Sequence, residues 1–152
     1  MWTMRCLRRR YAVFCVVLAT LACAGPQPGV IHYDGDSCDH CRMTISDPAF
    51  AGQLVTSTGK IYRFDDPACL VSFVTSGRVA PADVHSIWTN DHAHPDARIR
   101  AQDAVFVVSD RIRAPMNGKT AAFGSRQDAA ALQVSVGGQL QSWTDLLERR
   151  PS

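Results

Sequence analysis

Residues 50–74, which read FAGQLVTSTGKIYRFDDPACLVSFV, decide the fold of this chain. Residues 50–58 half-alternate between apolar and polar side chains, as a strand does when one of its faces is buried. Gly59 and Lys60 then form a turn, and residues 61–64 return as a second short strand pattern. This part of the stretch therefore predicts two strands joined by a turn.

A helix is predicted directly after the second strand. Asp66 is a good N-cap, because its carboxylate can accept hydrogen bonds from the free N–H groups of a first helical turn. Pro67 stands where proline is preferred in a helix, and Leu70, Phe73 and Val74 recur at helical spacing. The stretch as a whole predicts a strand–strand–helix (ββα) unit over about residues 50–76.

The second half of the chain repeats this order. Residues 103–109 have a continuous apolar centre, which is expected of a buried strand, and residues 120–123 give a second short strand pattern. Ser125 opens a helix with a near capping box, so a second ββα unit is predicted over about residues 103–136. Two ββα-type units in one small domain make an α+β fold.

The remaining segments have weaker patterns. Between the two units, HSIWTN (85–90) fits a strand, whereas DHAHPDAR (91–98) is typical of a loop. Near the end of the chain, SWTDLLER (142–149) fits a short helix.

The first residues indicate an export signal. Four arginines precede an apolar run from Tyr11 to Leu21, which is too short to remain as a membrane-spanning helix. The following Thr20-Leu21-Ala22-Cys23-Ala24 resembles a bacterial lipobox, in which the cysteine is lipidated and becomes the mature N-terminus. We therefore expect a lipoprotein signal peptide over 1–22, a lipidated N-terminus and linker over 23–35 and the domain over 36–149. An ordinary signal-peptidase cut after Ala24 is the alternative.

Removal of this leader changes the charge and the cysteine count. The mature part keeps twelve basic residues, the sixteen of the chain less the four of the leader, against fourteen acidic ones, a formal net charge of −2. No basic patch for nucleic acid is left. Cys38, Cys41 and Cys69 remain, and an odd number argues against a purely structural disulfide framework in an exported protein. Metal or redox chemistry is the remaining use for these thiols.

Cys38-x-x-Cys41-x-Met43 is the first candidate site. Thiolates and thioethers are soft donors that favour Cu(I) and zinc, and methionine indicates copper. The spacing of the two cysteines lets one loop bring both sulfurs to one ion. A local disulfide is the alternative, whereas a thioredoxin-like catalyst fits less well, because Pro48 interrupts any helix after Cys41. Among the histidines, His40 is the best placed to bind.

Cys69 and Met116 are further candidates. Cys69 falls in the first turn of the predicted helix, where free N–H groups favour a thiolate; a small buried hydrophobic residue is the alternative. Met116 lies in a Pro-Met-Asn-Gly turn, where either an exposed thioether or a buried loop anchor is expected. Asp65 and Asp66 are more simply interpreted as a helix cap than as acid–base machinery. No nucleophile–base set or phosphate loop is present, so we expect a protein that is not an enzyme.

The order of these motifs resembles that of one family. A lipoprotein leader, C-x-x-C-x-M, Y-x-F-D-D-x-x-C (62–69) and A-P-M-N-G-K-T-A-A-F (114–123) are similar to the NosL family over residues 36–147. These proteins are membrane-anchored accessory proteins in the maturation of nitrous oxide reductase. The resemblance implies a pair of ββα units and a copper chaperone. Such a chaperone binds Cu(I) outside the inner membrane and passes it towards the copper centres of the reductase.

The residues that match the family motifs are Cys38, Cys41, Met43, Asp65, Asp66, Cys69 and Met116. Many members follow the methionine with glycine and a histidine, whereas Asn117-Gly118-Lys119 supplies no imidazole here. We expect Cys38, Cys41 and Met43 to bind Cu(I), with Met116 or Cys69 completing the site. The expected partners are nitrous oxide reductase or its maturation machinery, and the expected location is the periplasmic face of a membrane. A thiol–disulfide oxidoreductase and a structural zinc domain are the alternatives, and the client enzyme and the oligomeric state stay open.

Overall fold

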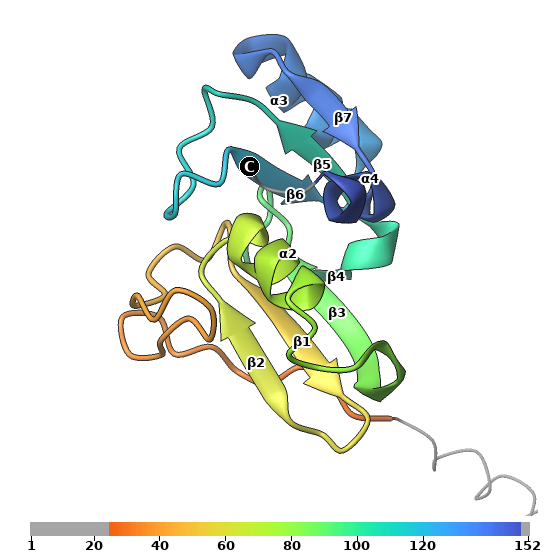
Figure 1. The fold of residues 1–152 in the computed structure, drawn as a ribbon. Coiled ribbons are helices and arrows are strands. Elements are labelled where there is room, and N and C mark those ends of the chain that lie inside the picture. Colours follow the sequence, from red (N-terminus) through yellow and green to blue (C-terminus); the bar gives the residue numbers. More distant parts are fainter. Residues whose placement is uncertain (1–24, 150–152) are drawn as a thin grey trace, which may run out of the picture.

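The structure is a computed structural model and describes residues 25–149 (Figure 1). The predicted leader over 1–22 and the predicted lipidation site Cys23 lie outside these residues. The helices and strands follow in this order: β1 (Gly52–Thr56), β2 (Ile61–Phe64), α2 (Pro67–Thr75), a 3-10 turn (Pro81–Asp83), β3 (Val84–Asn90), β4 (Arg98–Arg100), a second 3-10 turn (Ala101–Asp103), β5 (Val105–Val108), β6 (Thr120–Phe123), α3 (Arg126–Val136), β7 (Gln139–Gln141) and α4 (Trp143–Glu148). No helix within residues 25–149 has the length and apolar character needed to cross a bilayer.

The first unit begins with an antiparallel hairpin. β1 pairs with β2 from Gly52 opposite Phe64 to Val55 opposite Ile61. The connecting turn contains Gly59 at φ +86°, a conformation that glycine adopts without steric cost. After β2 the chain enters α2, where the Asp66 side chain accepts a 2.9 Å hydrogen bond from the backbone N–H of Cys69. The predicted N-cap is confirmed.

Two further strands extend this hairpin into a sheet. β3 pairs antiparallel with the other edge of β1, and β4 pairs with β3, which gives the order β2-β1-β3-β4. β3 contains the predicted HSIWTN strand. α2 covers one face of the sheet, and its contacts bury Leu70 and Phe73. A sheet with one helix on it needs a second cover for its other face.

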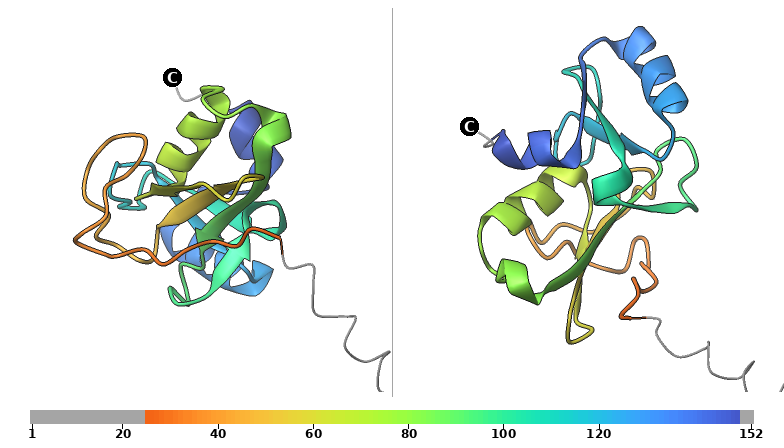
Figure 2. Two further views of the ribbon diagram at one scale, coloured as in Figure 1. Left: turned by 90° about the horizontal axis from the view of Figure 1, so that it is seen from below. Right: turned by 90° about the vertical axis from the view of Figure 1, so that its right-hand side faces the viewer.

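Residues 25–31 provide part of that second cover. They run along the face of the first sheet that is opposite to α2 (Figure 2, left). The Gln53 side chain, 1% exposed, donates a 2.9 Å hydrogen bond to the carbonyl of Gly29, and Ile31 is buried in the core. The described part of the predicted linker is therefore packed against the domain.

The second unit has a smaller antiparallel sheet, of order β6-β5-β7, with α3 packed on it. Ser125 caps α3 by accepting hydrogen bonds from the N–H groups of Gln127 and Asp128. β5 is covered on both faces: Phe106 belongs to one core cluster and Val107 to another. This double burial explains the continuous apolar run in the sequence. The predicted α+β class is confirmed.

The two units share one core. Phe64 and Phe73 of the first unit belong to the same buried cluster as Phe106 of the second unit. Trp143 of α4 belongs to it as well, and its ring centroid lies 6.0 Å from that of Phe106. α4 packs beside α2 at the junction of the units (Figure 2, right). Because this one cluster spans both units, they pack together as a single domain.

Candidate metal centre

The Cys38–Met43 segment is a tight loop. Ser37 and Thr44 form an isolated β-bridge, and inside it the N–H of Cys38 donates a 2.8 Å hydrogen bond to the carbonyl of Met43. Arg42 adopts φ +68°, which closes the loop with the N–H of Arg42 bonded to the carbonyl of Cys38. The closure brings the two cysteines of the C-x-x-C motif close together.

This loop is attached to the free edge of the first sheet. β2 is an edge strand, and its Arg63 exchanges two hydrogen bonds with Asp39. The N–H of Asp39 donates to the carbonyl of Arg63, and the N–H of Arg63 donates to the Asp39 carboxylate, each over 2.8 Å. Arg63 immediately precedes Phe64, after which Asp65 and α2 follow. The attachment therefore carries the C-x-x-C loop to the start of α2.

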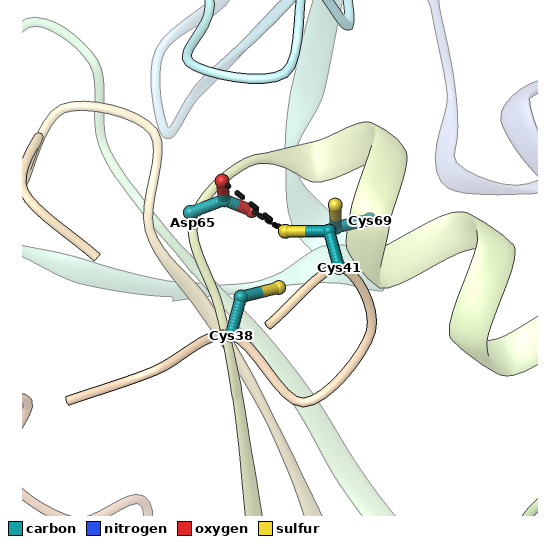
Figure 3. A group of neighbouring side chains, drawn as sticks. All are labelled: Cys38, Cys41, Asp65 and Cys69. Carbon is teal, nitrogen blue, oxygen red and sulfur yellow. Dashed lines mark hydrogen bonds between the residues drawn. The ribbon is translucent and has the colours of Figure 1, made fainter. Parts of the chain in front are cut away.

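Three thiols and one carboxylate meet at this point (Figure 3). One donor atom from each of Cys38, Cys41, Asp65 and Cys69 lies within 4.8 Å of all the others. Cys38 and Cys69 are 0% and 3% exposed, and Cys41 is half-buried. The Cys41 Sγ lies 3.7 Å from both carboxylate oxygens of Asp65. All three cysteines are free thiols.

The three thiols differ in proton affinity. The pKa of Cys38 falls to about 6, first because the Cys69 thiol donates a hydrogen bond to it; backbone N–H groups lower it further, while burial acts in the opposite direction. The pKa of Cys69 is raised, mainly by the same bond and then by burial. The pKa of Cys41 is raised chiefly by burial. Cys38 is therefore the first thiol to ionise.

The two predicted methionine ligands have exposed side chains. Met43, at the end of the cysteine loop, is 54% exposed, and Met116 is 38% exposed. The N–H of Met116 donates a 3.1 Å hydrogen bond to Asp66 Oδ2, so the β5–β6 loop rests on the first turn of α2. This contact brings Met116, distant in sequence, to the helix that carries Cys69.

Asp65 is not among the ligands expected from the sequence, in which both aspartates are interpreted as a helix cap. In the structure Asp66 caps α2, whereas Asp65 joins the thiols. The Y-x-F-D-D-x-x-C motif held the signal, since one N-cap needs only one of two adjacent carboxylates. His40 is not part of this cluster; its Nδ1 is buried without a hydrogen-bond partner among the described residues.

The cluster has the chemistry of a site for a soft metal ion. Thiols from a loop and from a helix start converge without a disulfide between them, and sulfur is the donor type that soft ions prefer. The carboxylate is a harder donor, and it already accepts a hydrogen bond from Cys41. A fixed oxygen beside three sulfurs can bind the ion or hold the Cys41 thiol in position.

Comparisons with known proteins agree with this arrangement. The model of the NosL family matches residues 30–150. The crystal structure of the copper chaperone NosL from Shewanella denitrificans is similar in fold, with a TM-score of 0.70 and 25% sequence identity over 79% of this chain and 95% of that chain. No curated protein matches significantly. The family model covers well over half of the sequence, and the chain belongs to the NosL family.

Proposed function

We propose that this protein binds Cu(I) through the thiols of Cys38, Cys41 and Cys69. The observation that carries the proposal is the convergence of three free thiols, two of them buried, within 4.8 Å of one another. Thiolate sulfur is the donor type that selects Cu(I) over harder cations. The similar fold of a protein described as a copper chaperone supports the choice of this ion over other soft metals.

We further propose that the bound copper is cargo. Met43 and Met116 have exposed side chains. Met43 ends the loop that carries Cys41, and the N–H of Met116 bonds to the cap of the helix that carries Cys69. Neutral thioethers bind Cu(I) more weakly than thiolates do. Such ligands suit the first and last steps of a transfer, in which copper exchanges with the ligands of another protein. The buried thiols would hold the ion between these steps.

The proposed recipient is nitrous oxide reductase or its maturation machinery, and the proposed role is delivery without catalysis. Family membership supports this assignment. A lipid on Cys23 would hold the protein on the periplasmic side of a membrane, where a single lipid-modified terminus anchors without spanning.

The alternative of a thiol–disulfide oxidoreductase fits the geometry less well. Such an enzyme needs an accessible thiol with a lowered pKa. Here Cys38 has the lowered pKa but is 0% exposed, and the accessible Cys41 has a raised pKa. No single cysteine among the described residues is therefore both accessible and low in pKa. A structural zinc site remains the competing use of the same donors.

Competition with a chromophoric Cu(I) chelator, under anaerobic reducing conditions, tests the binding step on the mature protein. We expect one tightly bound Cu(I), with weaker binding in Cys41→Ser and Cys38→Ser. Val134→Ser serves as the control, because Val134 is 88% exposed on the second unit. Unchanged binding in the first two variants would contradict the ligand assignment. Unfolding of the protein by zinc chelators would favour the structural zinc alternative.

Copper delivery needs a test in cells. We expect cells that lack this protein to make nitrous oxide reductase with a reduced copper content, restored by the wild-type chain but not by Cys69→Ser. A reductase with its full copper content in cells that lack this protein would mean that the protein serves a different client.

A further inference from the structure

Residues 25–31, which we call the strap, are held along their length. At the first residue, a Cβ on Gly25 would lie 2.8 Å from His85 Cε1, so the backbone is packed against that side chain. Further along, Arg98 Nη1 donates to the carbonyl of Pro28 over 3.4 Å, and Gln53 Nε2 donates to the carbonyl of Gly29 over 2.9 Å. The strap therefore follows the sheet from its first described residue.

The other end of the strap is fixed more firmly. Ile31 is 6% exposed and belongs to the core cluster. At Gly29 a Cβ would meet Ile61 Cδ1 at 2.9 Å, so the chain lies directly on β2. The hydrogen bond from the buried Gln53 side chain and the burial of Ile31 both favour the docked strap over a free one. Several such contacts keep the strap docked.

The strap begins at one particular end of the first sheet. His85 is the second residue of β3, whose start pairs with the end of β1 at Thr56. The β1–β2 turn, residues 57–60, lies at the same end, and all four of its residues are exposed, as is His85. We call this surface the anchor end. It is the end of the molecule from which the described chain starts (Figures 1 and 2).

We infer that the strap fixes the orientation of the domain on a lipid surface, with the anchor end against the phospholipid headgroups. The inference rests on the lipid anchor of the proposed function. Cys23 precedes Gly25 by two residues, which span at most about 7 Å. A lipid on Cys23 therefore holds Gly25, and with it His85, within that reach of the headgroups. The exposed Ser57, Thr58 and Lys60 of the anchor end are polar, as contact with headgroups requires.

This orientation turns the metal centre away from the membrane. Asp65 directly follows Phe64, which pairs with Gly52 at the opposite end of β1 from Thr56. Four residues of strand separate these ends by about 13 Å. The thiol cluster and the whole second unit thus extend from the far end of the sheet. Copper would be exchanged with a partner that approaches from the aqueous side and not through the lipid.

Hydrogen–deuterium exchange of the full-length protein, acylated in cells and reconstituted in nanodiscs of phosphatidylethanolamine and phosphatidylglycerol, tests the inference. The reference is the same chain with Cys23→Ala, which has no lipid. We expect slower exchange in the acylated protein at residues 57–60 and 82–86, and equal exchange at residues 37–44 and 114–119. Protection at the second pair of segments, or at neither pair, would overturn the inference.

A spacer provides the second arm of the experiment. About ten Gly/Ser residues between Ala24 and Gly25 add roughly 17 Å of flexible tether, so protection of the anchor end should disappear although the lipid remains. The same spacer after Ser152 is the matched control and should change nothing. Protection that survives the first spacer would show that the strap does not set the orientation.

Mass spectrometry of the N-terminal peptide separates this inference from the proposed function. Absence of the lipid would overturn both the orientation and the anchoring. The Cu(I) titration of the same sample would still report independently on the metal centre.

Discussion

The two ββα units share a frame but differ at the start of the helix. In the first unit Asp66 caps α2, and the third residue after the cap is Cys69. In the second unit Ser125 caps α3, and the equivalent position is Asp128. Both caps accept a hydrogen bond from that third residue. The frame therefore does not require a thiol at this position, and only the first unit has one.

The hairpin connections differ as well. β1 and β2 are joined by the tight turn 57–60, whereas β5 and β6 are joined by the long loop 109–119. That loop reaches the first unit, where the N–H of Met116 bonds to Asp66. The metal centre thus lies where the loop of one copy meets the helix cap of the other. The residues of the candidate site are therefore found where the two units differ, at Cys69 and in the 109–119 loop.

The largest effect on Cu(I) affinity is expected when the third residue after each helix cap is replaced by serine. Cys69→Ser removes a proposed ligand and should weaken Cu(I) binding by more than about 100-fold, the upper end of what loss of an indirect partner of a metal site costs. Asp128→Ser, in the second unit, should leave binding unchanged. Chelator competition measures both. Equal Cu(I) affinities in the two variants would show that Cys69 is not a ligand.

The second comparison is between the two caps. Asp66 is fully buried and accepts from the N–H groups of both Cys69 and Met116. Asp66→Ala leaves the buried N–H of Cys69 and the partly buried N–H of Met116 without this acceptor, which should lower the free energy of unfolding by about 2–3 kcal/mol. Ser125→Ala removes a more exposed cap and should cost about 1 kcal/mol. Urea unfolding of the metal-free protein measures both, and a larger loss for Ser125→Ala would contradict the difference in burial.

The sequence predicted the local elements better than the sheet that joins them. Strand alternation, the Asp66-Pro67 cap and the Ser125 cap are local signals, and each element that they predict is present. β4 and β7 were missed, because three residues such as Arg-Ile-Arg or Gln-Leu-Gln give too little pattern for a strand. Such strands form because a neighbouring strand offers a free edge, which is information from the tertiary fold.

The candidate site was predictable to a similar extent. The C-x-x-C spacing marked Cys38 and Cys41 as neighbours, because a short loop brings them together whatever the rest of the chain does. Nothing local brings Cys69 to them. That contact depends on the bonds between Asp39 and Arg63, which attach the cysteine loop to the edge of β2. The different roles of the two adjacent aspartates also became visible only in the folded chain.

The lowered pKa of Cys38 should make the stability of the metal-free protein depend on pH, an effect to which the second unit, which has no thiol, does not contribute. The folded pKa of Cys38 is about 6, against an ordinary value of 9.0. Between these values the unfolded chain binds more protons than the folded one, so the free energy of unfolding of the metal-free protein should rise with pH. Stability gained in this way is lost again as the pH falls through about 6. One proton limits the slope to about 1.4 kcal/mol per pH unit.

Urea unfolding at several pH values measures this slope. The Cys38→Ser variant should lack it, because no thiol with a lowered pKa remains. As the pH is lowered through about 6, the ultraviolet absorbance of the Cys38 thiolate should decrease in the wild type and should not change in the variant. An equal slope in both proteins would assign the ionisation to another group.

The smallest effect is expected from lifting the loop of the second unit off the cap of the first. A Cβ at Gly118 would lie 2.6 Å from Asp66 Oδ2 and 2.7 Å from Ala68 Cβ, so Gly118→Ala must displace the loop. Displacement breaks the bond from Met116 to Asp66, worth about 1 kcal/mol. If Met116 completes the site, Cu(I) affinity should fall by about fivefold, the equivalent of that energy.

Gly35→Ala is the matched control for Gly118→Ala. A Cβ there would meet the carbonyl oxygen of His32 at 3.4 Å, an ordinary contact, so copper binding should not change. The double variant Gly118→Ala with Met116→Leu tests the route of the effect. If the loop affects Cu(I) affinity only by holding Met116 in place, the double variant should bind copper no more weakly than Met116→Leu alone. Additive losses would mean that the loop also stabilises the cap and, through it, the position of Cys69.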